Sequence, residues 1–465
     1  MRITTKKAAI SFLMLFIAVT SEILFDTTSE KAIALVPVLF FIVAFFLCMD
    51  IRTLVDSNVG FCLYMLLFIR LYLLPVLIIS DGDYLRNIPL NYGLSNAYYF
   101  TQGVLLTVYE AVFVYAYIQF RVVKLTSSSQ IRNVNQLFKT NNFFLWVFIL
   151  LFFVITILYP QVYSERHFVL ALLRSEPTII QEQFRSTSLI ATVATISLRN
   201  IFLLLPIPIM SWIYFTRHKN WKESNARYYL FIVVSFCGYS LFIEGTSRIS
   251  VIVPLCTVIF VSNNLFPQYK RKTFRMGIVV LGVLVAFTTV WKFYVSRNIA
   301  FSIDLDDFVE TLELYFAGFS NMGKAWIAKS ESGLLLPQIR FFLNDLFANV
   351  PIINRFTSST WSASQYFVKV FSGRNDQIMP AIGNGMFYFG LLLSPIVSFI
   401  QIEVALWFER HAKTAFSFPK YVVFTYASIM LIYGCFGSIQ IFMQKLSINV
   451  LLAAIIVSIN EKRLK

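Results

Sequence analysis

Several arginines stand where the chain is expected to meet an anionic ligand. Arg248 closes the segment Glu244-Gly-Thr-Ser-Arg248, a short connection between two apolar runs that pins it at a helix end. Arg185, Arg340 and Arg374 lie in longer, more polar segments. A guanidinium presents a planar fork of donors that matches phosphate bidentately. These residues predict recognition of an anionic substrate, and the alternative is that the loop arginines are solvated or contact lipid phosphates.

Three ionisable residues fall inside apolar runs, where charge is costly and is usually functional. Arg70 and Glu110 lie at similar depths in neighbouring runs, which predicts an ion pair, with a proton relay as the alternative. Arg199 has no evident partner in its own run. It is therefore expected to face a cavity and bind substrate, unless its side chain extends to the interface or meets a distant partner.

Metal and redox chemistry have little support. Asp81-Gly82-Asp83 has the form of a metal-binding DxD pattern, but Gly82 also suits a simple turn. His167 is the one histidine expected on the outer face, so a histidine-rich metal site is excluded and the residue stays open as a general base. The five cysteines all lie in apolar runs without metal-ligand spacing, which predicts inert packing residues. No metal or cofactor is expected.

The elements that must position these residues are apolar helices. Of the 465 residues, 58% are apolar and 14% are charged, against about 45–50% and about 25% in soluble domains. A span of about 20 apolar residues crosses a bilayer. The sequence therefore predicts an all-α polytopic membrane bundle, a single integral membrane domain over 1–465, with about 12 transmembrane helices. These are expected at 8–25, 32–49, 58–80, 96–119, 142–160, 188–215, 228–243, 248–263, 276–295, 379–408, 421–438 and 446–460.

The net charge of +15 indicates orientation. One alternating set of short segments, which includes both termini, holds 22 lysines and arginines, and the opposite short loops hold 7. Because basic residues near span ends stay on the cytoplasmic side, both termini are expected there. This distribution explains the charge better than nucleic-acid binding does, and the lack of a GxxxxGK[ST] segment disfavours an ATP-driven pump.

One outer segment is far longer than the other loops. Residues 296–378, between the ninth and tenth expected spans, contain two periodic stretches, at 338–350 and 361–371. These stretches predict amphipathic helices lying on the membrane surface, as a lid over a membrane-embedded cavity. Loops of this length are usually functional.

The chain resembles the Wzy-type oligosaccharide repeat-unit polymerases. The resemblance rests on three features: about 12 spans with a large outer loop late in the chain, Gly245-Thr-Ser-Arg248 opening a span, and the Gly-rich aromatic run Ile382-Gly-Asn-Gly-Met-Phe-Tyr-Phe-Gly-Leu-Leu-Leu393. Arg374 and Gly385 also match the Arg-x10-Gly spacing of some members' outer loops. Arg174 and Arg185 in the smaller outer loop lack the corresponding glycine, which is a departure from the two-loop pattern.

The resemblance implies metal-independent glycosyl transfer at the outer face of the bacterial inner membrane. Both donor and acceptor would be glycans linked to undecaprenyl pyrophosphate, for O-antigen or capsular polysaccharide, with membrane lipids and a chain-length regulator protein as further partners. Arginines would stabilise the pyrophosphate leaving group, Arg248 first and then Arg374, Arg185, Arg199 and Arg340. Glu244 is the candidate general base for the acceptor hydroxyl, and an ion pair with Arg248 is its alternative role.

Two other functions remain open from the residues. A lipid-linked oligosaccharide flippase or other transporter can also have 12 spans, but its signature of Gly/Pro-interrupted span pairs is not evident in the sequence. An O-antigen ligase shares the architecture, and His167 keeps that alternative open. The expected assignment is therefore a polysaccharide polymerase, with transporter and ligase as rivals.

Overall fold

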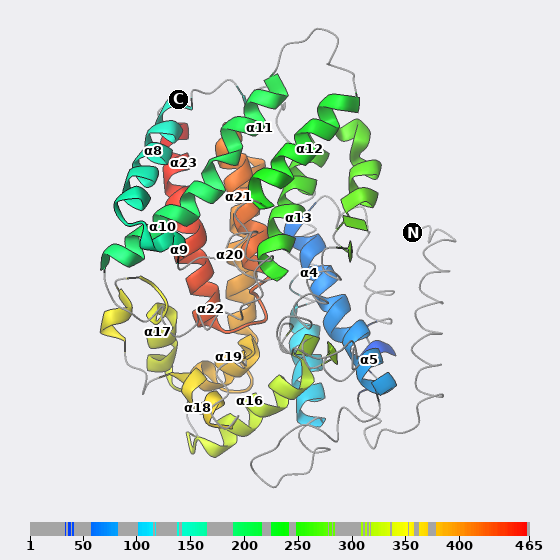
Figure 1. Cartoon of the computed structure of the whole chain (residues 1–465). Helices are drawn as coiled ribbons and strands as arrows, with labels where there is room; N and C mark the ends of the chain where they lie inside the picture. The colour runs from blue at the N-terminus through cyan, green and yellow to red at the C-terminus, as the bar shows by residue number, and fades with distance from the viewer. Residues whose placement is uncertain are drawn as a thin grey trace, which may run out of the picture. The chain divides into compact units, whose positions relative to one another are not determined.

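The computed structural model gives a helical protein (Figure 1). It describes residues 57–81, 101–114, 142–164, 189–215, 225–240, 248–277, 318–334, 337–351, 353–357, 362–370 and 378–462, together with 33, 36–38, 40, 117, 137–138, 279–280, 282–283, 308–309, 312–313 and 316. Every regular element in these residues is a helix, which confirms the all-α class. The expectations for Asp83 and His167 lie outside the described residues.

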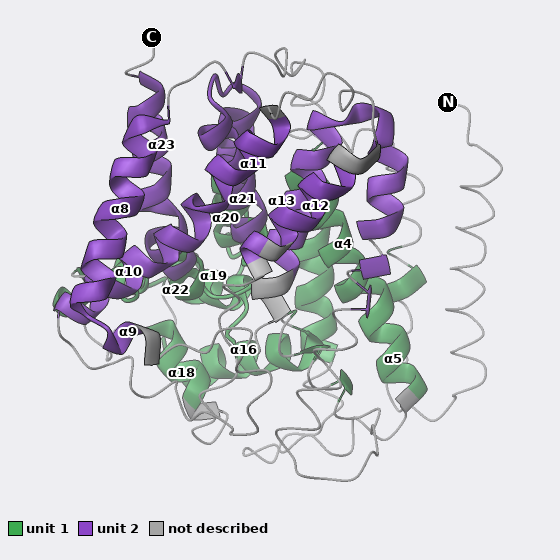
Figure 2. Cartoon of the chain, turned by 45° about the horizontal axis from the view of Figure 1, so that its top comes forward, with its two compact units in different colours: residues 1–128, 303–404, 432–443 green, residues 129–302, 405–431, 444–465 purple. Residues whose placement is uncertain are grey.

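The chain divides into two compact units, coloured in Figure 2. Unit 1 comprises residues 1–128, 303–404 and 432–443, and unit 2 comprises residues 129–302, 405–431 and 444–465. Each unit therefore collects segments that are distant in the sequence.

Unit 1 is built from an early apolar helix and a later group of short helices. Ser57 caps the first of these, since its Oγ accepts a hydrogen bond from the Gly60 amide at 3.0 Å. The α16, α18 and α19 helices pack on one another and lie side by side in Figure 1, and α17 packs on α19. The elements are α4 (Asn58–Phe68), η1 (Ile69–Leu73), α5 (Leu74–Asp81), α16 (Phe319–Glu331), α17 (Ile339–Phe347), η7 (Ile353–Phe356), α18 (Ala363–Val370), α19 (Ala381–Phe389), the first part of α20 (Ile396–Lys413) and α22 (Ile439–Gln444).

Unit 2 is a set of apolar helices packed on their neighbours. Helix α10 contacts α8, α11, η9 and α23, and α12 packs on both α11 and α13. The elements are α8 (Phe143–Leu158), α9 (Gln161–Ser164), α10 (Leu189–Leu204), α11 (Pro206–Phe215), α12 (Asn225–Ser240), α13 (Arg248–Leu265), η6 (Pro267–Tyr269), the second part of α20, α21 (Phe418–Ile432), η9 (Lys445–Leu451) and α23 (Leu452–Lys462).

Within the part of the chain that the structure describes, three helices are long and apolar enough to cross a membrane: Asn58–Ser80, Leu189–Tyr214 and Ile439–Lys462. The first two match the predicted spans at 58–80 and 188–215 within one residue at each end. The third begins seven residues before the predicted span at 446–460. The structure thus supports three spans, and the bundle of 12 stays a prediction.

Two predicted spans are wrong as continuous helices. The span expected at 379–408 ends at Phe389, and α20 begins only at Ile396. Gly390 has φ of 80°, a conformation that L side chains rarely adopt, and Pro395 follows at the end of the turn. The span expected at 421–438 likewise ends at Ile432, before the turn that precedes α22. Three of the six residues in each turn are apolar, and the flanking helices are strongly apolar, so the average hydropathy of a span-length window stays high across both turns.

Candidate functional site

The first candidate site surrounds Arg199 in unit 2. Arg199 lies within Leu189–Tyr214, and its Nη1 donates a hydrogen bond to Oδ1 of Asn449 in η9. The partner is 250 residues away along the chain and comes from a second helix long enough to cross a membrane. A distant partner, predicted as the alternative to a cavity-facing role, is thus present for Arg199 in the amide of Asn449.

Two tyrosines extend this polar cluster. The Arg199 charge acts on Tyr426 of α21, whose ring stacks on that of Tyr239 with centroids 6.5 Å apart. The Tyr239 side chain is buried, and within the described residues its hydroxyl has no hydrogen-bond partner. An unsatisfied buried hydroxyl costs about 1–3 kcal/mol, which a water or ligand oxygen would recover. We refer to Arg199, Tyr239, Tyr426 and Asn449 as the Arg199 cluster.

The second candidate site is a buried ion pair in unit 1. Arg70 and Glu110 are both almost fully buried, and Nη1 lies 3.0 Å from Oε2. The other carboxylate oxygen accepts a hydrogen bond from Ser398 Oγ at 2.5 Å, and the guanidinium lies 4.1 Å from the centre of the Phe436 ring. This confirms the ion pair predicted between Arg70 and Glu110. Arg70 sits in the π-helix η1, a local irregularity that is frequent at functional sites.

The two interrupted helices meet beside this ion pair. The Ala381 amide at the start of α19 donates to the Phe436 carbonyl at 3.0 Å, and the Ile439 amide at the start of α22 donates to Asn384 Oδ1, also at 3.0 Å. Gln401 Nε2 bonds the Gly437 carbonyl at 3.2 Å. The Phe436 and Gly437 carbonyls in the turn between α21 and α22 are therefore satisfied by α19 and α20, as non-helical backbone in a membrane requires.

A third polar cluster in unit 1 joins α17, α18, α19 and α22. Asp345 of α17 is fully buried and accepts hydrogen bonds from the Tyr388 hydroxyl at 2.7 Å, the Ala363 amide at 3.1 Å and Gln440 Nε2 at 2.6 Å. Gln440 Nε2 also bonds Ser362 Oγ at 2.9 Å. Burial raises the pKa of the Asp345 carboxyl, while these hydrogen bonds act in the opposite direction. Asp345 thereby joins α17 to the beginnings of α18 and α22 and to the end of α19.

The remaining predicted site residues have different outcomes. Arg340 is exposed on α17, with its guanidinium carbon 5.9 Å from the Phe341 ring centre, so the structure does not place it in a buried anion site. Helix α13 begins at Arg248, as expected of a residue that opens a span. The Arg248 side chain, Glu244, Arg185 and Arg374 lie outside the described residues.

Gly385, matched above to an Arg-x10-Gly spacing, has a packing role. It is buried in α19, and a Cβ at this position would overlap the Ser394 carbonyl of the turn that follows the helix. Gly383 similarly approaches Ala325 of α16. These glycines allow close packing within unit 1.

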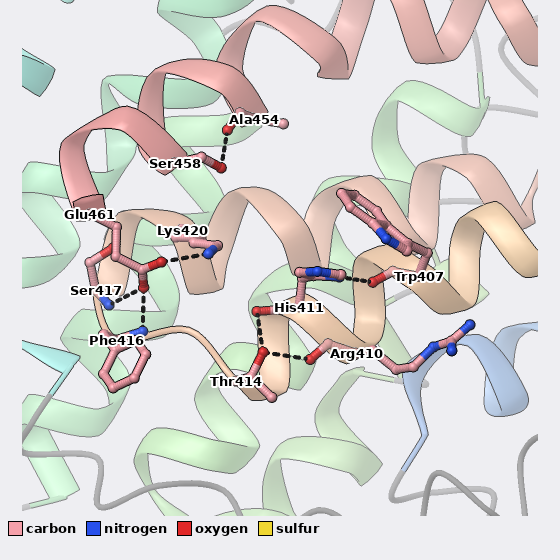
Figure 3. Close-up of polar contacts among 10 residues, drawn as sticks. All are labelled: Trp407, Arg410, His411, Thr414, Phe416, Ser417, Lys420, Ala454, Ser458 and Glu461. Carbon is pink, nitrogen blue, oxygen red and sulfur yellow. Dashed lines mark hydrogen bonds and ion pairs between the residues drawn. The ribbon is translucent and has the colours of Figure 1, made fainter.

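A cluster of polar side chains in unit 2 joins the end of α23 to the start of α21 (Figure 3). Glu461 near the end of α23 accepts hydrogen bonds from the amides of Phe416 and Ser417, and it forms an ion pair with Lys420 at 2.5 Å. His411 Nδ1 lies 2.8 Å from the Trp407 carbonyl at the end of α20. This group caps α21 and has the character of a structural contact.

The sequence did not predict four residues of these polar clusters. Asn449, Tyr239, Tyr426 and Asp345 carry no local motif, and only folding joins them to their partners. Comparison with known proteins finds no matching family model, no matching curated protein and no matching solved structure.

Proposed function

We propose that this protein extends glycans linked to undecaprenyl pyrophosphate by glycosyl transfer at the outer face of the cytoplasmic membrane. The observation that carries the proposal is the Arg199 cluster: a permanent cation inside a helix able to cross a membrane, held by a neutral amide beside two tyrosines. Such an arrangement suits an anionic group, because a guanidinium remains charged and can donate to phosphate oxygens. The sequence resemblance supplies the identity of that anion.

In the proposed reaction, the acceptor hydroxyl oxygen bonds to the donor's anomeric carbon while the bond from that carbon to pyrophosphate oxygen breaks. The acceptor proton passes to Glu244, and the electron pair leaves on the pyrophosphate. Arg199 and Arg248, with Arg185, stabilise the charge that develops there. Arg248 stands at the first turn of α13, where the helix dipole also favours negative charge.

The test is a chromosomal deletion complemented with variants, followed by gel analysis of the glycans. Removing one preorganised charged donor costs about 10²–10³ in rate, so Arg199→Gln should reduce polymer to single repeat units. Arg275→Gln is the matched control, because Arg275 is exposed and belongs to the basic residues expected on the cytoplasmic side. This variant should leave polymer length unchanged. Immunoblots must show equal protein. Normal polymer from both Arg199→Gln and Arg248→Ala would refute the proposal.

A lipid-linked oligosaccharide flippase is the second candidate, and a specific observation favours it. Interrupted helices are typical of secondary transporters, and the chain is interrupted near Gly390, between α19 and α20, and near Gly437, between α21 and α22. The deletion separates the candidates. Repeat units that accumulate on the cytoplasmic leaflet indicate a flippase, single units on the lipid core indicate a polymerase, and retained lipid-linked polymer indicates a ligase.

A further inference from the structure

Helix α17 and the following η7 present a surface that mixes apolar and basic side chains. Ile339 and Leu343, one helical turn apart on α17, are 58% and 52% exposed, and Phe356 of η7 is 88% exposed. Arg340 and Arg355 are exposed in the same two elements. We call these five residues the α17–η7 surface. Large apolar side chains bordered by cations are typical of a surface that binds at the headgroup level of a membrane.

The orientation of α17 is fixed from its opposite face. Phe341 and Asp345 are buried, and the Asp345 carboxylate is held by Tyr388, Ala363 and Gln440. Because Asp345 would be left without its donors if the helix rotated, α17 must keep Ile339 and Leu343 outward. The exposed apolar side is therefore a consequence of how the buried side is bonded.

The height of α17 follows from the same hydrogen bonds. Gln440 is the second residue of Ile439–Lys462, a helix able to cross a membrane, and its Nε2 lies 2.6 Å from Asp345 Oδ1. A helix bonded to the first turn of a span lies at the level where that span enters the bilayer. Exposed apolar residues at this level meet the boundary between headgroups and acyl chains.

We propose that the α17–η7 surface docks on the bilayer, with Ile339, Leu343 and Phe356 in the boundary layer and with Arg340 and Arg355 on the phosphates of anionic phospholipids. Charge complementarity favours this partner over a neutral protein surface. Arg340 thereby acquires a role in membrane contact in place of substrate binding. The inference depends on the chain spanning a membrane and is independent of glycosyl transfer.

The experiment uses the full-length chain in vesicles with a fluorescent NBD label at Phe356→Cys or, separately, at Leu343→Cys. The three described native cysteines, Cys62, Cys256 and Cys435, are buried, and the unsubstituted chain supplies the labelling blank. Lipids with a doxyl quencher near the headgroup should quench the label at either position. An equally exposed but polar position, Glu331→Cys at the end of α16, is the control and should remain unquenched.

The arginines are tested by comparing phosphatidylcholine vesicles with vesicles that also contain phosphatidylglycerol. Each cation near an anionic surface should raise the ratio of docked to undocked segment by about fivefold. Phosphatidylglycerol should therefore increase quenching, and the Arg340→Gln/Arg355→Gln variant should lose that increase. Quenching no greater than at Glu331→Cys, or a phosphatidylglycerol effect that survives in the double variant, would overturn the proposal. Neither readout involves glycan synthesis, so the membrane-docking proposal can fail while the proposed function holds.

Discussion

Two arginines inside apolar helices have different partners among the described contacts. Arg70 meets a carboxylate, Glu110, which is itself held by Ser398. Arg199 instead donates to the amide of Asn449. A buried ion pair is often replaceable by apolar residues, whereas a guanidinium that donates to an amide oxygen remains charged and can also donate to the oxygens of an anion. This difference is why we assign a structural role to Arg70 and a substrate role to Arg199.

The structural role of the Arg70–Glu110 pair gives a prediction at the residue scale. Glu110→Gln leaves the buried guanidinium without its counter-charge and should destabilise the protein by about 3–5 kcal/mol. The double variant Arg70→Met/Glu110→Leu removes both charges and should regain most of that loss. Thermal unfolding of the purified chain in detergent measures both. A double variant that is stable but unable to make polymer would instead show that the pair takes part in the activity.

At the scale of elements, helix ends in this protein are satisfied by side chains from distant segments. The start of α21 has the Glu461 carboxylate as its cap, although 44 residues separate Ser417 from Glu461 (Figure 3). The start of α22 is bonded by Asn384 in the same manner. Such contacts join elements that local sequence does not relate.

Removal of the α21 cap should have a measurable effect. Glu461→Ala deprives the Phe416 and Ser417 amides of their acceptor and should cost about 0.5–2 kcal/mol. Lys420→Met removes only the ion pair and should cost less, about 0–1 kcal/mol. Thermal unfolding gives the ranking, and hydrogen exchange at residues 416–418 locates the effect. Equal losses in the two variants would assign the stabilisation to the ion pair rather than to the cap.

The turn between α19 and α20 depends on a close approach at Gly385. Gly385→Ala forces a Cβ onto the Ser394 carbonyl, so the turn must shift, and the unfolding temperature should fall. Gly282→Ala is the matched control, because nothing lies within 4 Å of its added Cβ and alanine favours a helix by about 0.5–1 kcal/mol. The control should be neutral or stabilising in the same thermal assay. Unchanged stability in Gly385→Ala would mean that the close contact between Gly385 and the Ser394 carbonyl does not constrain the turn.

At the scale of the whole molecule, the surface that faces the solvent or lipid matters, and on helix α8 the exposed side is apolar along the entire helix. Helix α8 buries Leu145, Ile149 and Phe152 against its neighbours. Its other side carries exposed apolar residues at successive helical turns: Phe143, Trp146, Val147, Leu150, Leu151, Val154, Ile157 and Leu158. Water would make this surface an aggregation site, whereas lipid covers it without penalty.

A charge on that face distinguishes lipid from water. Leu150 is 62% exposed, so Leu150→Asp would be tolerated by a water-facing helix. Within a bilayer, aspartate at the middle of a helix costs about 2.5–3.5 kcal/mol. Leu150→Asp should therefore lower the amount of protein recovered in the membrane fraction, and Leu150→Ala should not. Equal recovery of the two variants would contradict a lipid-facing α8.

The sequence by itself determined the helical class, the positions of two long apolar helices and the Arg70–Glu110 pair. These features depend on composition, on apolar run length and on depth along a run, all of which are local quantities. Tertiary structure alone decided the interruptions at Gly390 and near Gly437, because a span-length window that includes either turn remains apolar on average. It also decided the partners of Arg199, Asp345 and Glu461, since buried polar groups are satisfied by whatever the fold brings within hydrogen-bond distance. No spacing in the sequence encodes a bond across 250 residues.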